Sequence, residues 1–157
     1  MGEVEQRLAE LGLEVPELVP PVAAYVPAVL DGSRVYVSGQ LPMVRGAMPE
    51  TGRVGEGPGL VSPERAKELA AFCALNVIAA VKSVVGDLDR VERVVKVVGF
   101  VASDPSFTGQ PVVVNGASEL FAAAFGSAGV HARSAVGVMA LPLDAPVEVE
   151  AILHVRD

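Results

Sequence analysis

The spacing of hydrophobic and polar positions predicts three helices. Residues 3–11 carry their apolar side chains on one side, as in a short amphipathic helix. A longer helix is expected after Ser62, because serine is a good N-cap and the proline and glutamate that follow suit the first helical turn. It continues to Gly86 with apolar residues on more than one face, so we expect it to be largely buried. A weaker pattern predicts a third helix over 111–125. The apolar side of the first helix is formed by Val4, Leu8 and Leu11.

Strand-like runs near the start of the chain predict a hairpin. Residues 25–30 and 34–38 flank Asp31–Gly32, which is a strong turn signal. Pro27 limits the first strand to an edge or an irregular position, since proline cannot donate to a ladder. Gly39 is expected to end the second strand.

The rest of the chain adds three strands and two irregular segments. A valine-rich strand is expected over 91–102, and two more strand-like runs lie within 131–152, on either side of a connection at 141–146. Proline and glycine predict an extended connector over 13–22 and a loop over 41–59. The order of elements indicates a mixed α+β domain with its helices on one sheet face. The other face needs a cover, which oligomerisation could supply.

Composition and charge narrow the class of protein. With 157 residues, 51% of them hydrophobic and 20% charged, the chain predicts one compact domain over 1–157. The net charge of -7 and the lack of a clustered basic stretch argue against nucleic acid as a ligand. We expect no membrane span and no signal peptide, because no uncharged apolar run is long enough and the first residues are charged.

The chain has one cysteine, Cys73, so no intrachain disulfide can form, and a reducing cytoplasm is the simplest setting. Because Cys73 falls inside the long apolar helix, we interpret it as a buried core residue rather than a reactive thiol. The two histidines, His131 and His154, lack the neighbours of a metal site, so no metal is expected. We interpret His154 as a surface or interface residue.

Charges inside the predicted sheet are the sharpest candidates for chemistry. Arg133 has small or apolar neighbours, and its guanidinium could hold a carboxylate through two parallel hydrogen bonds. The alternative is a salt bridge to Glu148 or Glu150 across a hairpin. These two glutamates share one strand face, with Val147, Val149 and Ala151 on the other. Glu148 could hold or deprotonate a water, or could be a solvated strand residue.

Polar residues elsewhere offer weaker candidates. Tyr25 could present its hydroxyl or ring to a ligand, or pack in the core. Ser38 and Gly39, at a strand end, could bind an anion or water through the backbone, or form a plain turn. Asn115 interrupts an apolar run and is either a satisfied helix-start amide or a polar group aimed at a pocket.

Several of these residues lie in motifs that resemble the YjgF/RidA family, the reactive intermediate deaminases. The motifs occur in the family's order and at closely similar spacings, over roughly residues 22–155. Ser-Gly-Gln-x-Pro and Ala-Arg-Ser are specific in combination. The matching segments are Val35–Pro42, Asn115 with the residues around it, Ala132–Val136, Leu141–Pro142 and Val147–Ile152.

This resemblance implies a chorismate-mutase-like (ferredoxin-like) α+β fold with two main helices on one sheet face. It also implies a homotrimer with clefts between subunits, and hydrolysis of 2-imino acids to 2-keto acids and ammonia without a metal or organic cofactor. On this basis Arg133 would hold the substrate carboxylate and Glu148 would orient the attacking water. The other positions matching the pocket are Tyr25, Ser38, Gly39 and Asn115.

The chain also departs from the family pattern. A cysteine often follows the arginine by two residues in the family, and this chain has Ala135 there. The helix at 3–11 and the long 41–61 loop resemble a divergent subgroup. The alternatives to a deaminase are a protein of the same fold that binds a small carboxylate such as a keto acid, and a ribonuclease or translation inhibitor, which the acidic balance does not favour.

Overall fold

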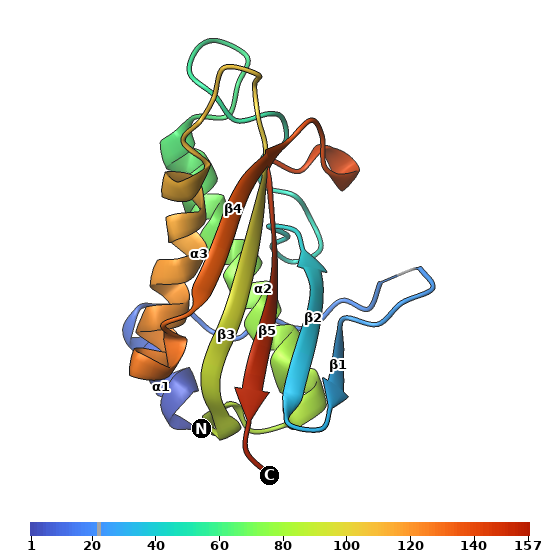
Figure 1. The fold of residues 1–157 in the computed structure, drawn as a ribbon, viewed down its shortest axis with the longest axis vertical. Helices are drawn as coiled ribbons and strands as arrows, with labels where there is room; N and C mark the ends of the chain where they lie inside the picture. Colours follow the sequence, from blue (N-terminus) through green and yellow to red (C-terminus); the bar gives the residue numbers. More distant parts are fainter. Residues whose placement is uncertain (22) are drawn as a thin grey trace.

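The computed structural model describes residues 1–21 and 23–157 and contains a five-stranded sheet (Figure 1). The spatial order of the strands is β1-β2-β5-β3-β4, with β4 parallel to β3 and the other neighbours antiparallel. The strands are β1 (Ala28–Asp31), β2 (Arg34–Gln40), β3 (Val91–Ala102), β4 (Ala132–Val138) and β5 (Val147–Val155). The helices are α1 (Glu3–Glu10), α2 (Pro63–Val85) and α3 (Gln110–Phe125), with 3-10 turns at Leu88–Arg90, Gly126–Gly129 and Pro142–Asp144.

The long helix α2 begins and ends where the sequence predicts. The Ser62 hydroxyl accepts a hydrogen bond from the Arg65 amide at 3.2 Å, and Gly86 follows the last turn with a φ of 77°. By length and composition α2 could cross a membrane, but 61% of its most apolar window is buried inside the protein. That burial is typical of a core helix, as the apolar pattern on several of its faces predicts.

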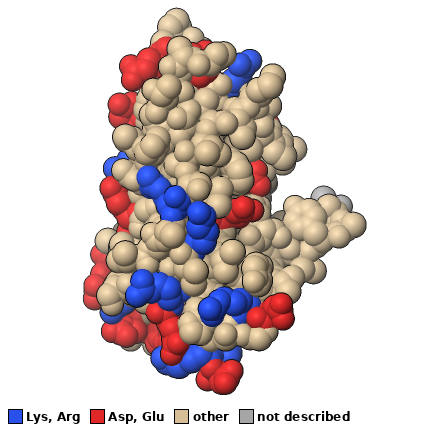
Figure 2. Space-filling model, viewed as in Figure 1, with Lys and Arg blue, Asp and Glu red and all other residues tan. Residues whose placement is uncertain are grey.

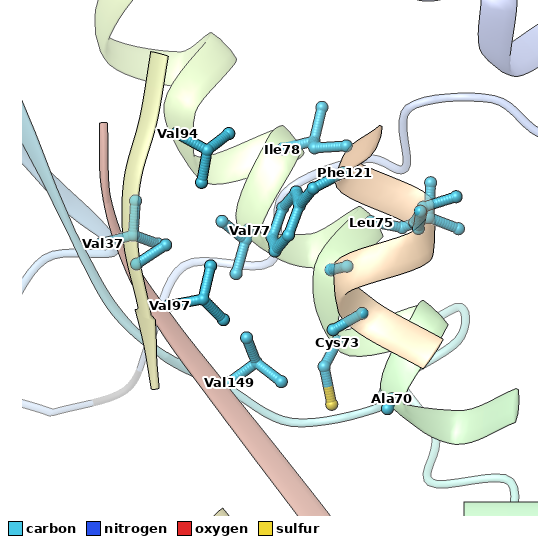
Figure 3. Close-up of a cluster of buried hydrophobic side chains, with 14 of the residues drawn as sticks. Val37, Ala70, Cys73, Leu75, Val77, Ile78, Val94, Val97, Phe121 and Val149 are labelled. Carbon is cyan, nitrogen blue, oxygen red and sulfur yellow. The ribbon is translucent and has the colours of Figure 1, made fainter. Parts of the chain in front are cut away.

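Helices α2 and α3 cover one face of the sheet, so the α+β class and the helix layer are confirmed (Figure 1). Between the layers, Phe121 of α3 points among Val77 of α2 and Val97 of β3 (Figure 3). Cys73 lies fully buried in the same core, as expected. Burying a valine or phenylalanine fully contributes roughly 1.5–3 kcal/mol relative to exposure, so the packing between helices and sheet stabilises the fold strongly.

No helix among the described residues covers the opposite face of the sheet. This uncovered face carries both polar and apolar side chains. In β5 every second residue is buried against the helices, while Glu148 and Glu150 lie on the uncovered side. Tyr36 of β2 is 46% exposed on that side, although it is large and apolar. We call this surface the open face of the sheet.

Helix α1 is fastened at its first turn. The two carboxylate oxygens of Asp89 accept hydrogen bonds from the amides of Glu3 and Val4, at 2.8 and 3.0 Å. Val4 and Leu8 are buried, as predicted, but Leu11 is 54% exposed. The prediction for Leu11 is wrong because the helix ends one residue before it.

The first hairpin differs from prediction at both ends. β1 begins at Ala28, so Tyr25 lies before the strand, and Pro27 is consistent with its edge position. β2 does not end at Gly39 but continues to Gln40 through a register shift between Val37 and Gln40. A bulge of this kind lets a strand bend without leaving the sheet.

Two further expectations concern the connections. Residues 13–21 form no helix or strand, as predicted for the connector, and Val22 lies outside the described residues. The expected hairpin between the last two strands is wrong, because β3 lies between β4 and β5. The long loop contains only isolated bridges, of Val44 with Ala47 and of Val54 with Val61 and Ser103.

Candidate active site

Arg133 lies on the edge strand β4 and points toward the helix layer. Its partner in the parallel ladder is Val97, which is fully buried under the helices, and paired residues share a face of the sheet. Because β4 is an edge strand, the long side chain can leave the core sideways and reach α3. Its charged end is therefore only partly buried.

Neutral oxygen atoms of α3 hold the guanidinium. Nη1 donates to Asn115 Oδ1 at 2.7 Å and to Ser118 Oγ at 3.2 Å, and Nη2 donates to the Pro111 carbonyl at 3.3 Å. Among residues 1–21 and 23–157, no carboxylate pairs with Arg133. The alternative of a salt bridge to Glu148 or Glu150 is therefore wrong.

The hydrogen bonds of Arg133 leave part of its fork open. A guanidinium has five N–H donors, and three are used here. Within the described chain, Nε–H and one Nη2–H have no partner. Nε and Nη2 lie on the same edge of the guanidinium, which is the edge that can meet both oxygens of a carboxylate.

The Asn115 amide contacts this arginine, and its direction toward a ligand pocket stays a prediction. It lies on α3 near the start of the helix, and its carbonyl oxygen makes the shortest contact to the guanidinium. Ser118 is one turn further along the same face, and His131 just before β4 contacts Ser118. Sequence reasoning considered neither Ser118 nor this role for His131, although the three-residue spacing from Asn115 was a usable signal.

Glu148 lies on the open face, opposite to Arg133. Its ladder partner is Phe100, and its carboxylate lies directly over Gly39 of β2. A Cβ at position 39 would collide with that carboxylate, so the glycine makes room for it. Burial, and then the nearby charge of Glu150, raise the pKa of Glu148 above its usual range. The folded protein therefore holds the protonated form of Glu148 more readily than a free glutamate would.

The last residues of β2 lie beside the segment before β1. They include Ser38 and Gly39, and that segment carries Tyr25. The Ser38 hydroxyl donates to the Val26 carbonyl at 2.7 Å and its amide donates to the Pro27 carbonyl at 2.9 Å, which ties down the segment that carries Tyr25. Tyr25 is 56% exposed, so the core-packing alternative is wrong. Tyr25 and Gly39 line a cavity of about 370 Å³, together with residues of the 16–21 connector.

The predicted site residues thus form two groups that one chain does not bring together. Arg133 and Asn115 lie at the β4 edge on the helix side. Glu148 and Gly39 lie on the open face, with Ser38 and Tyr25 close by. Two such groups can meet only if a second copy of the chain contributes one of them.

Other kinds of site find little support. The described residues contain no cluster of three or more histidine, cysteine or acidic residues placed for a metal ion. Burial, and then the Glu148 charge, raise the pKa of the Cys73 thiol well above its usual value, so it is a poor nucleophile. His154 is partly exposed and lies 3.7 Å from Glu92. On the side shown in Figure 2, a short run of basic side chains crosses the middle of the molecule and further basic side chains lie near the bottom, with acidic side chains beside both.

The five-stranded sheet with its helix layer matches a chorismate-mutase-like α+β fold. The family model described as "YjgF/chorismate mutase-like, putative endoribonuclease" matches residues 5–152. The chain therefore belongs to the YjgF/RidA family.

Three relatives have nearly the same length. Protein TCP17 of Trypanosoma cruzi is 44% identical, over 99% of this chain and 96% of that protein. The crystal structure of Atu1372 from Agrobacterium tumefaciens, of unknown function, is 44% identical, with a TM-score of 0.89 over 98% of this chain and 94% of that one. A Shewanella oneidensis protein described as a "putative endoribonuclease" is 28% identical, with a TM-score of 0.92 over 98% of this chain and all of that one.

Proposed function

We propose that this protein hydrolyses reactive 2-imino acids to 2-keto acids and ammonia, with Arg133 as the group that binds the substrate carboxylate. The observation that supports this most directly is the state of the guanidinium. Neutral oxygens hold it in place, no acidic side chain of the described residues neutralises it, and two of its N–H donors remain open. Such a cation attracts a small carboxylate with fixed geometry.

The chemistry asks little more of the protein than positioning. Water adds to the electrophilic imine carbon as one of its protons moves to nitrogen, which gives a carbinolamine. The proton of the carbinolamine hydroxyl then moves to nitrogen as the C–N bond breaks, which releases ammonia and leaves a C=O group. In this proposal Glu148 orients the water and carries the proton, because its half-buried carboxylate lies over Gly39 in the proposed pocket and burial favours its protonated form. Tyr25, Ser38, Gly39 and Asn115 would line the pocket around the substrate.

The proposal requires an oligomer. Because Arg133 and Glu148 lie on opposite faces of one sheet, we place each site in a cleft between two subunits of a homotrimer. The uncovered apolar residues of the open face, such as Tyr36, favour a partner subunit there. We further propose that residues 1–157 form one domain that acts in the cytoplasm without binding a membrane.

A protein that binds a small carboxylate without turnover is the alternative, and one observation favours it. The open fork of Arg133 does not depend on Glu148, so binding could persist without chemistry. The RNA cleavage suggested by the name of the Shewanella protein has weaker support, since the chain carries a net charge of -7.

The test uses freshly generated 2-iminobutanoate and follows ammonia release. We expect acceleration by the wild-type protein, loss of activity in Arg133→Ala and retained activity in Arg93→Ala, an exposed arginine of β3. Wild-type protein that accelerates no 2-imino acid would refute the deaminase. If Glu148→Gln binds 2-oxobutanoate with unchanged affinity and neither form turns over imine, the binding protein is correct. RNA cleavage that persists in Arg133→Ala or disappears on further purification would indicate a contaminant.

A further inference from the structure

Arg133 is the first member of a chain of hydrogen bonds that continues through two side chains to the backbone. Ser118 Oγ lies 3.2 Å from Arg133 Nη1 and 2.8 Å from His131 Nε2, and His131 Nδ1 lies 2.6 Å from the Gly129 carbonyl oxygen. The members come from β4, α3 and the segment between them. None of these contacts is explained by the fold alone, since an apolar side chain could pack at position 131.

For a neutral imidazole ring, the chemistry of the atoms sets the direction of each of these hydrogen bonds. The Gly129 carbonyl can only accept, so Nδ1 of His131 must carry the hydrogen. Nε2 of the neutral ring is then an acceptor, and the Ser118 hydroxyl must donate to it. This leaves the lone pairs of Ser118 Oγ directed toward Arg133, which can only donate.

The histidine ring itself is held firmly. It packs edge-on against Phe121, with ring centroids 5.9 Å apart and an angle of 85° between the rings. Phe121 is fully buried in the core shared by α2, α3 and the sheet. The orientation of the ring, and with it that of the Ser118 hydroxyl, is therefore set by the core.

We infer that Ser118 and His131 are positioning residues, which hold the guanidinium so that its Nε–H edge faces a bound carboxylate. This inference rests on the proposed function, because the carboxylate belongs to the 2-imino acid. Without His131, a helical serine would turn its hydroxyl hydrogen toward its own backbone, and Arg133 would lose a fixed acceptor. A guanidinium with fewer constraints loses more conformational entropy when it binds its ligand.

Matched substitutions separate the loss of a hydrogen-bonding group from a change in side-chain size. Ser118→Ala removes the hydroxyl and Ser118→Thr keeps it, while His131→Leu removes the acceptor and His131→Gln keeps an oxygen near the position of Nε2. We expect Ser118→Ala and His131→Leu to raise the KM for 2-iminobutanoate, and the Kd for 2-oxobutanoate, by about 3- to 10-fold. The kcat should stay within about twofold, because carboxylate binding is the same before and during the reaction.

The conservative variants and a control complete the experiment. Ser118→Thr and His131→Gln should remain within about twofold of wild type, as should Ser127→Ala, an exposed serine of the turn before His131. If His131→Gln is as impaired as His131→Leu, or if kcat falls while KM is unchanged, the positioning role is wrong. Protein that fails to fold is recognised by its circular dichroism, and the threonine and glutamine variants then decide.

A spectroscopic measurement keeps the inference separate from the deaminase proposal. In long-range ¹H–¹⁵N spectra at pH 8.5, His131 should be the Nδ1–H tautomer in wild type, and Ser118→Ala should shift its Nε2 resonance. An Nε2–H tautomer would overturn the inference whatever the activity. If wild type hydrolyses no imine but the variants still weaken 2-oxobutanoate binding, the deaminase fails and the positioning role holds. If wild type neither hydrolyses an imine nor binds a 2-oxo acid, both fail.

Discussion

Replacing Arg133 with lysine tests how the carboxylate is held, since the positive charge remains and the fork is lost. The arginine offers two N–H donors on one edge, whereas an ammonium group is a point charge that reaches one oxygen well. A hydrogen bond to a charged group contributes about 1.5–3 kcal/mol net. Losing one of the two bonds should therefore weaken 2-oxobutanoate binding roughly 10- to 100-fold.

Stability should change much less than affinity. Arg133 is only partly buried, and the oxygen atoms of Asn115 and Ser118 that it leaves can turn to water. We expect the free energy of unfolding to fall by no more than about 1 kcal/mol, as measured in urea. This difference separates loss of the fork from loss of the fold.

Calorimetry with 2-oxobutanoate and the ammonia assay provide the measurement. Arg93→Lys is the matched control, because Arg93 lies on neighbouring β3 and its guanidinium donates a hydrogen bond to the Val130 carbonyl, at 3.3 Å. It should bind as wild type does. If Arg133→Lys binds 2-oxobutanoate as tightly as wild type, then charge alone holds the ligand and the two-pronged geometry is irrelevant.

Three further predictions concern packing, pH and the first helix. Gly116→Ala should lower the free energy of unfolding by about 1–3 kcal/mol, because the added Cβ would collide with the Lys67 carbonyl oxygen where α2 and α3 touch. An unchanged midpoint of urea unfolding would contradict this contact. Burial raises the pKa of Glu148, so the folded state binds its proton more tightly than the unfolded state. Glu148→Gln should therefore be more stable than wild type at pH 7, with the gain disappearing as the pH falls below the ordinary glutamate pKa; a gain that grows on acidification would reverse the sign. Asp89→Ala should cost about 0.5–2 kcal/mol by removing the cap of α1. Asp89→Asn should lose less, because its single amide oxygen can still accept one of the two hydrogen bonds, and equal losses in the two variants would contradict this.

Local signals in the sequence were enough to predict most helices and strands. Ser62 with the residues after it marks the start of α2, and the valine run gives β3 its full extent of Val91–Ala102. Leu11 and Gly39 were harder, because a helix can end early and a strand can continue through a bulge without a distinct residue pattern. These boundaries depend on packing against distant elements.

Local sequence patterns could not predict the order of the strands in the sheet. The short connection at 141–146 favours a hairpin, yet β4 pairs with β3, which is more than 30 residues away along the chain. That pairing decides which way Arg133 points, since its neighbour Val97 lies under the helices. The residue pattern alone made Arg133 and Asn115 candidates and the resemblance gave them roles, but the hydrogen bonds through Ser118 and His131 became visible only with α3 beside β4.

The opposite placement of Arg133 and Glu148 has a consequence for mixtures of inactive proteins. If every site takes its arginine from one subunit and its glutamate from the next, Arg133→Ala and Glu148→Gln chains should complement each other in the same ring. With equal amounts and random exchange, a site has even odds of an intact arginine and, independently, even odds of an intact glutamate, so about a quarter of the wild-type sites should be restored. Two dead preparations would become active when refolded together, which no arrangement within a single chain could produce.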